Sequence, residues 1–418
     1  MKDTHKWTKG KTALIVFDCI LCLAILISSM MIVIDNSRIK NGAVYPGDKD
    51  SISDSDSGKP AILQGTASAR LMCAGDNLIH RSIYRQAKER AGSGGYDFSY
   101  SYENIKDIIQ LADIAFLNQE TIIDPEGEPS SYPLFNSPKE LLDEMIEVGF
   151  DVFNQATNHT MDRKLSGALN DLELFNSKEN ILLTGLYKTR EDMMKPQTQE
   201  INGITFSFVG FTEFLNGLSV PSDSDLGLVY LTDKRYSEAE IYETMNQMID
   251  NAKKASDIVC VSMHWQTEDI TVPDESQQQI TQKLLEYGAD IIIGTGPHVL
   301  QPIEYKQNGD GENALVIWSL GNIISCQNKK NNMLGGIADV TVTKDLGTGK
   351  TRIESAKLIP TITHYGSNFS NVKIIPFVDY SEELASEHGV NSNSFTYNYI
   401  SDFYTNMFGN NLKINYKE

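Results

Sequence analysis

The chain has 418 residues, with 36 Lys and Arg against 56 Asp and Glu, which gives a formal net charge of −20. So large a negative charge repels phosphate backbones and argues against nucleic acid as a partner. The five cysteines are odd in number and show no ligand spacing, so neither a disulfide framework nor a thiolate metal site is expected.

The N-terminus predicts a membrane anchor. Residues 1–11 form a basic tail, and residues 12–34 form an apolar run whose only charge is Asp18. Such a run is long enough to cross a hydrocarbon core, and its basic flank places the rest of the chain outside the cell. We therefore expect a single-pass protein of the cell membrane with an extracytoplasmic body. A cleaved signal peptide is the alternative, although no Ala-x-Ala site follows the run.

Residues 35–67 predict a tether between this anchor and the body. The segment is acidic and rich in serine, including the stretch DKDSISDSDSGKP. Such a composition buries too little apolar surface to fold. The tether therefore holds the body at a variable distance from the membrane.

From Ser68 onward, short apolar runs alternate with amphipathic stretches, which predicts an α/β body. The strand-like runs are RLMCAG, IAFLN, DVFNQ, ILLTG, ITFSFVGF, DIVCVSMH, DIIIG and ALVIWSL. The helical patterns cover Ser137–Val148, Asp162–Phe175, Ser237–Lys254 and Glu275–Tyr287. We assign residues 68–375 to the main domain and 376–418 to an accessory helical segment. The alternating stretch Gly335–Leu358 is expected to belong to a cap on this body.

Several apolar runs end in residues that bind metals. These residues are Asp76, Glu120, Asn158, His159, His264 and His298. A lone Asp after a strand is more often a helix cap, and a lone His is more often structural. Six such residues at five separate strand ends favour one crevice, because such loops converge beyond the carboxyl edge of a sheet. Oxygen and imidazole donors together suit a divalent cation such as Mn, Zn or Fe.

Six ordered segments resemble a known family. The segments CAGDNLIH, FLNQE, ATNHTMD, MHWQTED, GPHVLQPIE and WSLGNII are similar, in this order, to motifs of the CapA family of capsule and poly-γ-glutamate biosynthesis proteins. The resemblance implies a metallophosphatase-like four-layer sandwich, in which two packed sheets are flanked by helices. It also implies membrane attachment with an external body.

The resemblance also implies site roles. The metal ligands would be Asp76, Glu120, Asn158, His264 and His298. His159 would donate a proton or hydrogen bond to a reacting oxygen, and Gly75 would allow the turn that aims Asp76. The residues that orient ligands or face substrate would be Asp162, Glu268, Glu304 and Asn322, with Asp162 and Glu268 counted with His159 as catalytic. His80 could equally reach this site or occupy an exposed position on a surface helix.

The chain departs from the family pattern at two positions. The family usually has His where Gly296 stands, and Gly where Gln266 stands. Loss of an imidazole should weaken one metal position, unless Gln266 or another residue replaces it. On this reasoning, Gly296→His should raise metal occupancy.

Three functions remain open at this point. The first is a CapA-like factor that makes, exports or releases an anionic surface polymer, together with membrane partners of a capsule synthesis complex. The second is a free-standing extracytoplasmic metallophosphoesterase or amide hydrolase, which acts on a phosphoester or amide. The third is a non-catalytic binding subunit with a degraded metal site.

Overall fold

The computed structural model describes residues 65–390 and 394–416. The predicted basic tail, membrane anchor and most of the tether lie outside these residues. Within the described part of the chain, no helix combines the length and the apolar character that a membrane crossing requires.

The first sheet has eight strands, in the order β14-β13-β12-β1-β2-β3-β4, with β11 also paired to β1. Strands β1 to β4 run parallel, whereas β12, β13 and β14 are antiparallel to their neighbours. The bounds are β1 Thr66–Asn77, β2 Ile114–Asn118, β3 Val152–Asn154, β4 Leu182–Thr184, β11 Asn322–Ile324, β12 Leu334–Asp345, β13 Thr351–Gly366 and β14 Ser370–Pro376.

The second sheet has six strands, in the order β5-β6-β7-β8-β10-β9. Strands β6, β7, β8 and β10 are parallel, and antiparallel strands close both edges. The bounds are β5 Gln197–Ile201, β6 Ile204–Thr212, β7 Ile258–His264, β8 Ile291–Thr295, β9 Leu300–Gln307 and β10 Asn313–Leu320. The predicted strand-like runs all lie in these two sheets.

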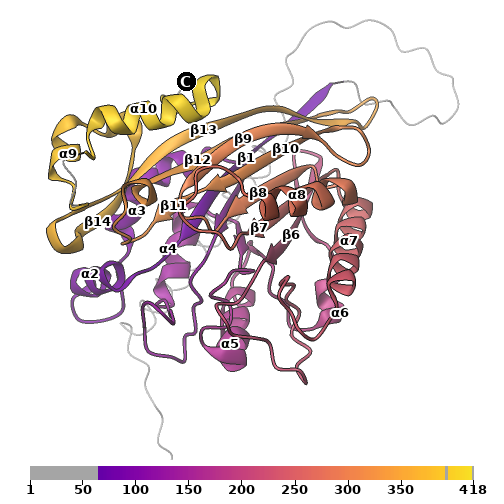
Figure 1. The fold of residues 1–418 in the computed structure, drawn as a ribbon, viewed down its shortest axis with the longest axis horizontal. Helices are drawn as coiled ribbons and strands as arrows, with labels where there is room; N and C mark the ends of the chain where they lie inside the picture. The colour runs from indigo at the N-terminus through magenta and orange to yellow at the C-terminus, as the bar shows by residue number, and fades with distance from the viewer. Residues whose placement is uncertain (1–64, 391–393, 417–418) are drawn as a thin grey trace, which may run out of the picture. The chain divides into compact units, whose positions relative to one another are not determined.

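Helices accompany the sheets, and the four predicted helical patterns are present within one to three residues at each end. The bounds are α2 Arg81–Ala91, α3 Ser99–Ile109, α4 Glu140–Val148, α5 Lys164–Asn176, α6 Arg190–Met193, α7 Glu238–Ala255, α8 Glu275–Tyr287, α9 Glu382–Glu387 and α10 Tyr397–Phe408. Figure 1 shows α7 and α8 beside the second sheet, and α4 and α5 near the first. The α/β class is therefore confirmed, with two sheets and helices.

Alternation along the second sheet explains how it is buried on both faces. Cys260 of β7 belongs to the core shared with the first sheet, whereas its neighbours Val259 and Val261 pack in a second core with α7 and α8. Successive side chains of a strand point to opposite faces, so one strand serves both cores. The sheets meet at Phe116 of β2 and Phe208 of β6, whose rings stack with centroids 6.3 Å apart.

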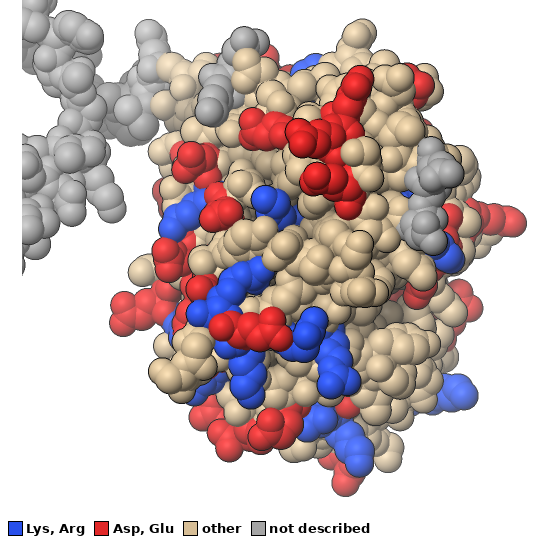
Figure 2. Space-filling view, turned by 90° about the vertical axis from the view of Figure 1, so that its left-hand side faces the viewer, with Lys and Arg blue, Asp and Glu red and all other residues tan. Residues whose placement is uncertain are grey.

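The expectation that Gly335–Leu358 belongs to a cap is wrong. Strand β12 pairs along its length with β1, the strand that carries Asp76, so this stretch lies inside the main sheet. Helix α10 packs on it: the Tyr404 hydroxyl donates to the carbonyls of Gly335 (3.0 Å) and Thr361 (2.7 Å). On α9, Glu382, Glu383 and Glu387 are exposed. Figure 2, which shows the left-hand side of Figure 1, has acidic side chains gathered in its upper part.

Both sheets direct parallel strands to the same region. Strands β1, β2 and β3 of the first sheet and β6, β7 and β8 of the second end in loops that carry polar residues. The contact of β1 with β8 and β10 brings the two sets of strand ends together. Side chains from distant parts of the sequence therefore meet at these ends.

Candidate metal centre

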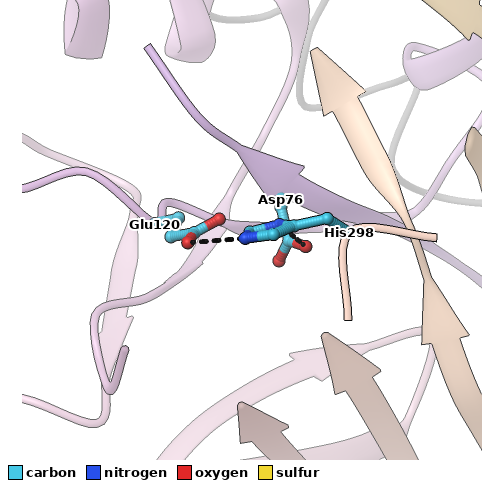
Figure 3. A group of neighbouring side chains, drawn as sticks. All are labelled: Asp76, Glu120 and His298. Atoms are coloured by element: carbon cyan, nitrogen blue, oxygen red, sulfur yellow. Dashed lines mark hydrogen bonds and ion pairs between the residues drawn. The ribbon is translucent and has the colours of Figure 1, made fainter. Parts of the chain in front are cut away.

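Three buried side chains form the centre of the site. Asp76 lies in β1, Glu120 follows β2, and His298 follows β8; each offers a ligand atom within 4.8 Å of the others (Figure 3). His298 Nδ1 is 3.0 Å from Asp76 Oδ2, and its Nε2 is 3.7 Å from Glu120 Oε1. Two carboxylates and an imidazole are a donor set that divalent cations such as Mn, Zn and Fe accept.

His264 at the end of β7 faces the same carboxylates. Its Nε2 lies 3.9 Å from Glu120 Oε1 and its Nδ1 lies 4.0 Å from Asp76 Oδ1. The Nδ1 atom is also 3.2 Å from Thr295 Oγ1. A proton on Nδ1, donated to Thr295, leaves the lone pair of Nε2 free for a cation. Burial lowers the pKa of His264 to about 3, so the ring is neutral, as a ligand must be.

Two buried amides and a backbone N–H hold Asp76 in place. Asn118 Nδ2 donates to Asp76 Oδ1 (2.8 Å), and Asn154 Nδ2 donates to Asn118 Oδ1 (2.8 Å). The Gly296 N–H lies 3.1 and 3.2 Å from the two carboxylate oxygens. Burial raises the pKa of Asp76, but the hydrogen bond and charge of His298, with His264 and Gly296, hold it below its ordinary value. Asp76 is therefore ionised.

Gly75 was expected to allow a tight turn that aims Asp76, and this expectation is wrong. Strand β1 continues through Gly75 to Asn77, so no tight turn occurs there. A side chain is excluded instead by the neighbouring strand connection, because a Cβ at Gly75 would lie 2.0 Å from the Gly321 carbonyl oxygen. That close approach lets Asp76 N donate to the same carbonyl (2.9 Å).

Glu120 gives the clearest test of whether a cation fits. Both of its carboxylate oxygens are buried without a hydrogen-bond partner, and so are His264 Nε2 and Asn158 Oδ1. Burial raises the pKa of Glu120 most strongly. The charge of His298 lowers this pKa and the nearby carboxylates raise it, so it stays well above its ordinary value. Buried polar atoms are rarely left unpaired, and a divalent cation would satisfy a carboxylate, an imidazole and an amide oxygen together. The residues present fit a metal.

His298 is held in a strained and charged setting. Its φ is +60°, in the left-handed region that non-glycine residues seldom adopt. Burial lowers the pKa of His298, but Glu120, Asp76 and Glu268 more than reverse this and raise it to about 10. A divalent cation held by the same carboxylates would take the place of this proton, because a ligand imidazole must be neutral. Asn322 Nδ2 donates to the His298 carbonyl (3.3 Å), which ties this loop to β11.

His159 and Asp162 form a hydrogen-bonded pair beside Glu120. His159 Nδ1 is 2.6 Å from Asp162 Oδ2, and its Nε2 is 3.9 Å from Glu120 Oε1. Asp162 also accepts from the Phe135 N–H (2.7 Å), which fixes the carboxylate. This pairing orients the imidazole so that Nε2 points toward the carboxylates. Asn158 is adjacent and donates to Asn216 Oδ1 (3.4 Å).

Other predicted residues lie at different depths. Glu268 Oε1 is 3.9 Å from His298 Nε2, but its side chain is 50% exposed, so it lies on the rim. The ring of His80 packs edge-on against Phe135 (5.3 Å), which packs in turn against His159 (4.7 Å). Glu304 is exposed on the edge strand β9 and accepts from Trp318 Nε1 (3.1 Å), and among the described residues no contact joins it to the metal centre.

The expectation for Gly296→His is contradicted by the backbone. Gly296 has φ +98°, and a Cβ there would lie 2.4 Å from the Trp265 carbonyl oxygen and 2.9 Å from its nitrogen. No side chain enters this space without moving the backbone. The Gln266 side chain, offered as a replacement ligand, is exposed. Gly296 serves the site through its N–H to Asp76 rather than as a vacant ligand position.

A family profile matches this part of the chain. The profile described as "Bacterial capsule synthesis protein PGA_cap" matches residues 70–327, which include every strand end described above. The chain belongs to the PGA_cap family. The family resemblance drawn from the six ordered segments is therefore confirmed.

Two characterised PGA_cap relatives are similar to the chain. The PGA biosynthesis protein CapA of Bacillus subtilis (strain 168) is 32% identical over 216 residues, which cover 51% of this chain and 53% of that protein. The capsule biosynthesis protein CapA of Bacillus anthracis is 28% identical over 193 residues, covering 45% and 43%. The chain thus spans about half the length of these relatives.

One solved structure, a novel phosphatase from Mycoplasma pneumoniae, aligns with 71% of this chain and 94% of its own. The TM-score is 0.40 and the identity is 15%. A TM-score of this size does not establish a shared fold for the PGA_cap chain.

Four polar residues of the PGA_cap site escaped the sequence analysis: Asn118, Asn154, Thr295 and Asn216. Asn118 and Asn154 each close a strand, in FLN and VFN, and each precedes a Gln. This repeated Asn-Gln at the ends of neighbouring strands was the available signal. Asn216 lies in a loop, and nothing in its sequence context points to the site.

Proposed function

We propose that this PGA_cap protein acts on an anionic surface polymer such as poly-γ-glutamate by metal-assisted hydrolysis or transfer, as a membrane-anchored protein with an extracytoplasmic body. One observation carries the catalytic part of the proposal. Glu120 and His264 lie beside Asp76 and His298 and carry buried ligand atoms that no protein group satisfies, and the buried Oδ1 of Asn158, next to His159 in the chain, is also unsatisfied. A cation is the simplest partner for such a set.

Asp76, Glu120, His264 and His298 would hold the metal, with Asn158 as an amide ligand. A divalent ion bound there would act as a Lewis acid on a carbonyl or phosphoryl oxygen. The chain's own contribution is to orient the ligands. Asn118 and Gly296 fix Asp76, and the Thr295 hydroxyl can accept from Nδ1 of His264 in the tautomer whose Nε2 is free.

His159 would serve as the proton donor or acceptor for the reacting group. Its hydrogen bond to Asp162 orients the ring, and Nε2 points toward the metal ligands. Glu268 on the rim would face the substrate rather than the metal. This division of roles parallels that of metallophosphatases, and a metallophosphatase-like fold and chemistry form part of the proposal.

The polymer and the location rest on separate support. The names of the two relatives refer to PGA biosynthesis and capsule biosynthesis. The lysine-rich tail and the apolar run after it favour an uncleaved anchor with the body outside. Protease added to intact cells should therefore remove a tag fused after Glu418, and protection of that tag would overturn the topology.

Metal analysis of the purified full-length protein tests the catalytic proposal. We expect a stoichiometric divalent metal that chelation removes, together with hydrolysis of poly-γ-glutamate or a small phosphoester that is lost on chelation and restored by the metal. Asp76→Asn and His298→Ala should abolish metal retention. Asp290→Asn, which alters a buried carboxylate of the second sheet that bonds Val259 N, is the matched control and should keep the metal.

The outcomes separate the remaining alternatives. Turnover of a small phosphoester but not of the polymer would favour a free-standing metallophosphoesterase. Retention of metal without any turnover would favour a non-catalytic binding subunit. Failure to retain metal in the parent protein would refute the proposed chemistry.

A further inference from the structure

A basic surface lies beside the candidate metal centre of this acidic protein. We define the α2 surface as Arg81, Arg85, Lys88 and Arg90 of helix α2 together with Lys373 of β14, which packs against this helix. Figure 2 shows Lys and Arg side chains gathered in the lower part of the face that bears α2, below the acidic group. The surface contrasts with the formal charge of −20 of the whole chain.

Most cations of the α2 surface are not neutralised by carboxylates. Arg85 pairs with Glu89 at 3.3 Å, but both side chains are more than half exposed, so water screens the pair. In the described part of the chain, no ion pair is seen for Arg81, Lys88, Arg90 or Lys373. Arg81 and Lys88 are exposed and Lys373 is half-buried, so these three remain available to an anionic ligand, whereas one guanidinium nitrogen of Arg90 is buried.

Tyrosines hold some of these cations in place. The Arg90 guanidinium lies 4.0 Å from the ring centroid of Tyr100, and Lys373 Nζ lies 5.4 Å from the same centroid. Lys88 Nζ lies 5.7 Å from the centroid of Tyr96. Cation–π contact orders a side chain without cancelling its charge. The positive groups are therefore partly preorganised for a ligand.

Helix α2 connects this surface to the metal centre. Its N-cap is His80, whose ring lies 5.3 Å from the ring of Phe135. Phe135 lies 4.7 Å from the ring of His159 and donates its N–H to Asp162. The α2 surface thus begins about one aromatic side chain away from the residues that would act on the substrate.

We propose that the α2 surface binds a linear polycarboxylate and guides it to the metal centre. This inference rests on the proposed function and adds the surface that recognises its substrate. Successive carboxylates of an extended chain can pair with cations spaced along a helix, and opposite charge also accelerates capture. The exposed carboxylates of α9 border the same face and would repel the polymer from that side.

A lipid surface fits these observations less well. None of the large apolar side chains that are exposed in the described residues belongs to α2 itself; Tyr132 and Leu134 are exposed only beside its start, in the loop whose Ser131 hydroxyl accepts from the Arg81 N–H. The negative charge of the rest of the molecule would also oppose its approach to an anionic membrane. A flexible soluble polyanion can follow the cations of the α2 surface, whereas a broad membrane surface would also face the carboxylates around them.

Binding of fluorescently labelled poly-γ-glutamate to the full-length protein tests the proposal. The test variant carries Arg81→Gln, Lys88→Gln and Lys373→Gln. The matched control carries Lys195→Gln, Lys254→Gln and Lys350→Gln, which removes the same charge from other elements. Loss of three ion pairs with polymer carboxylates should weaken binding of the test variant about tenfold or more and flatten the salt dependence of its affinity. The control variant should lose only about twofold in affinity.

Several results would overturn the proposal. Equal losses in the two triple variants would indicate attraction without a specific surface, and unchanged affinity in the test variant would exclude the α2 surface. Binding to phosphatidylglycerol vesicles that depends on these residues, without polymer binding, would assign the surface to the membrane. The test variant should retain its metal as the parent does, so loss of the metal chemistry and loss of the docking surface are measured separately.

Discussion

Replacement of Gly296 by alanine tests how the loop after β8 is built. Gly296 has φ +98°, and a Cβ there would lie 2.4 Å from the Trp265 carbonyl oxygen. A positive φ costs a residue with a Cβ about 1–2 kcal/mol, and forcing an atom into a packed site costs about 1–3 kcal/mol more. Gly296→Ala should therefore lower the free energy of unfolding by about 2–5 kcal/mol.

Gly203 supplies the matched control. It has φ +79° in the turn between β5 and β6, and a Cβ there would meet nothing within 4 Å. Gly203→Ala should therefore cost only the backbone part, about 1–2 kcal/mol. The difference between the two variants isolates the crowding at Gly296.

Urea denaturation followed by tryptophan fluorescence measures both variants, since Trp265 and Trp318 are buried near this loop. Metal retention should also fall in Gly296→Ala, because the clash of the added Cβ would shift the backbone and move the N–H of residue 296 away from Asp76. Gly296→His should lower metal retention at least as much. If Gly296→Ala were no more destabilising than Gly203→Ala, the loop would have room for a side chain. A rise in metal content with Gly296→His would restore the interpretation of a vacant ligand position.

Three further predictions follow from particular contacts. Asn118→Ala should lower metal affinity about 10- to 100-fold, because Asp76 loses an orienting donor; metal titration measures it, and unchanged affinity would remove Asn118 from the site. Phe208→Ala should cost about 3–5 kcal/mol of unfolding free energy through a cavity between the sheets, whereas a loss under about 1 kcal/mol would mean that the sheets close up around it. Burial lowers the pKa of His364 and of His388 to about 4 in the folded protein. Their contribution to stability is therefore present above the unfolded pKa near 6.5 and is lost as pH falls toward about 4. His388→Gln should reduce this loss in urea denaturation at pH 7 and pH 4.5, and an unaltered pH dependence would contradict the assignment.

The candidate centre could be found in the sequence because of where its residues stand. Fully buried parallel strands are short apolar runs, so the polar residue that ends each run is conspicuous. Asp76, His264 and His298 were recognised in this way, and the ordered segments around them identified the family. Their catalytic and metal-binding roles stay predictions.

The sequence by itself determined the α/β alternation, the main helices and the strand ends that carry polar residues, because these depend on periodicity within one segment. Only the tertiary structure decided what lies across from each segment. It placed β12 beside β1, exposed Glu304 on an edge strand, and brought Trp265 so close to Gly296 that no side chain fits. Strand order and close backbone approach depend on contacts between residues far apart in the chain, and local composition and spacing carry no record of them.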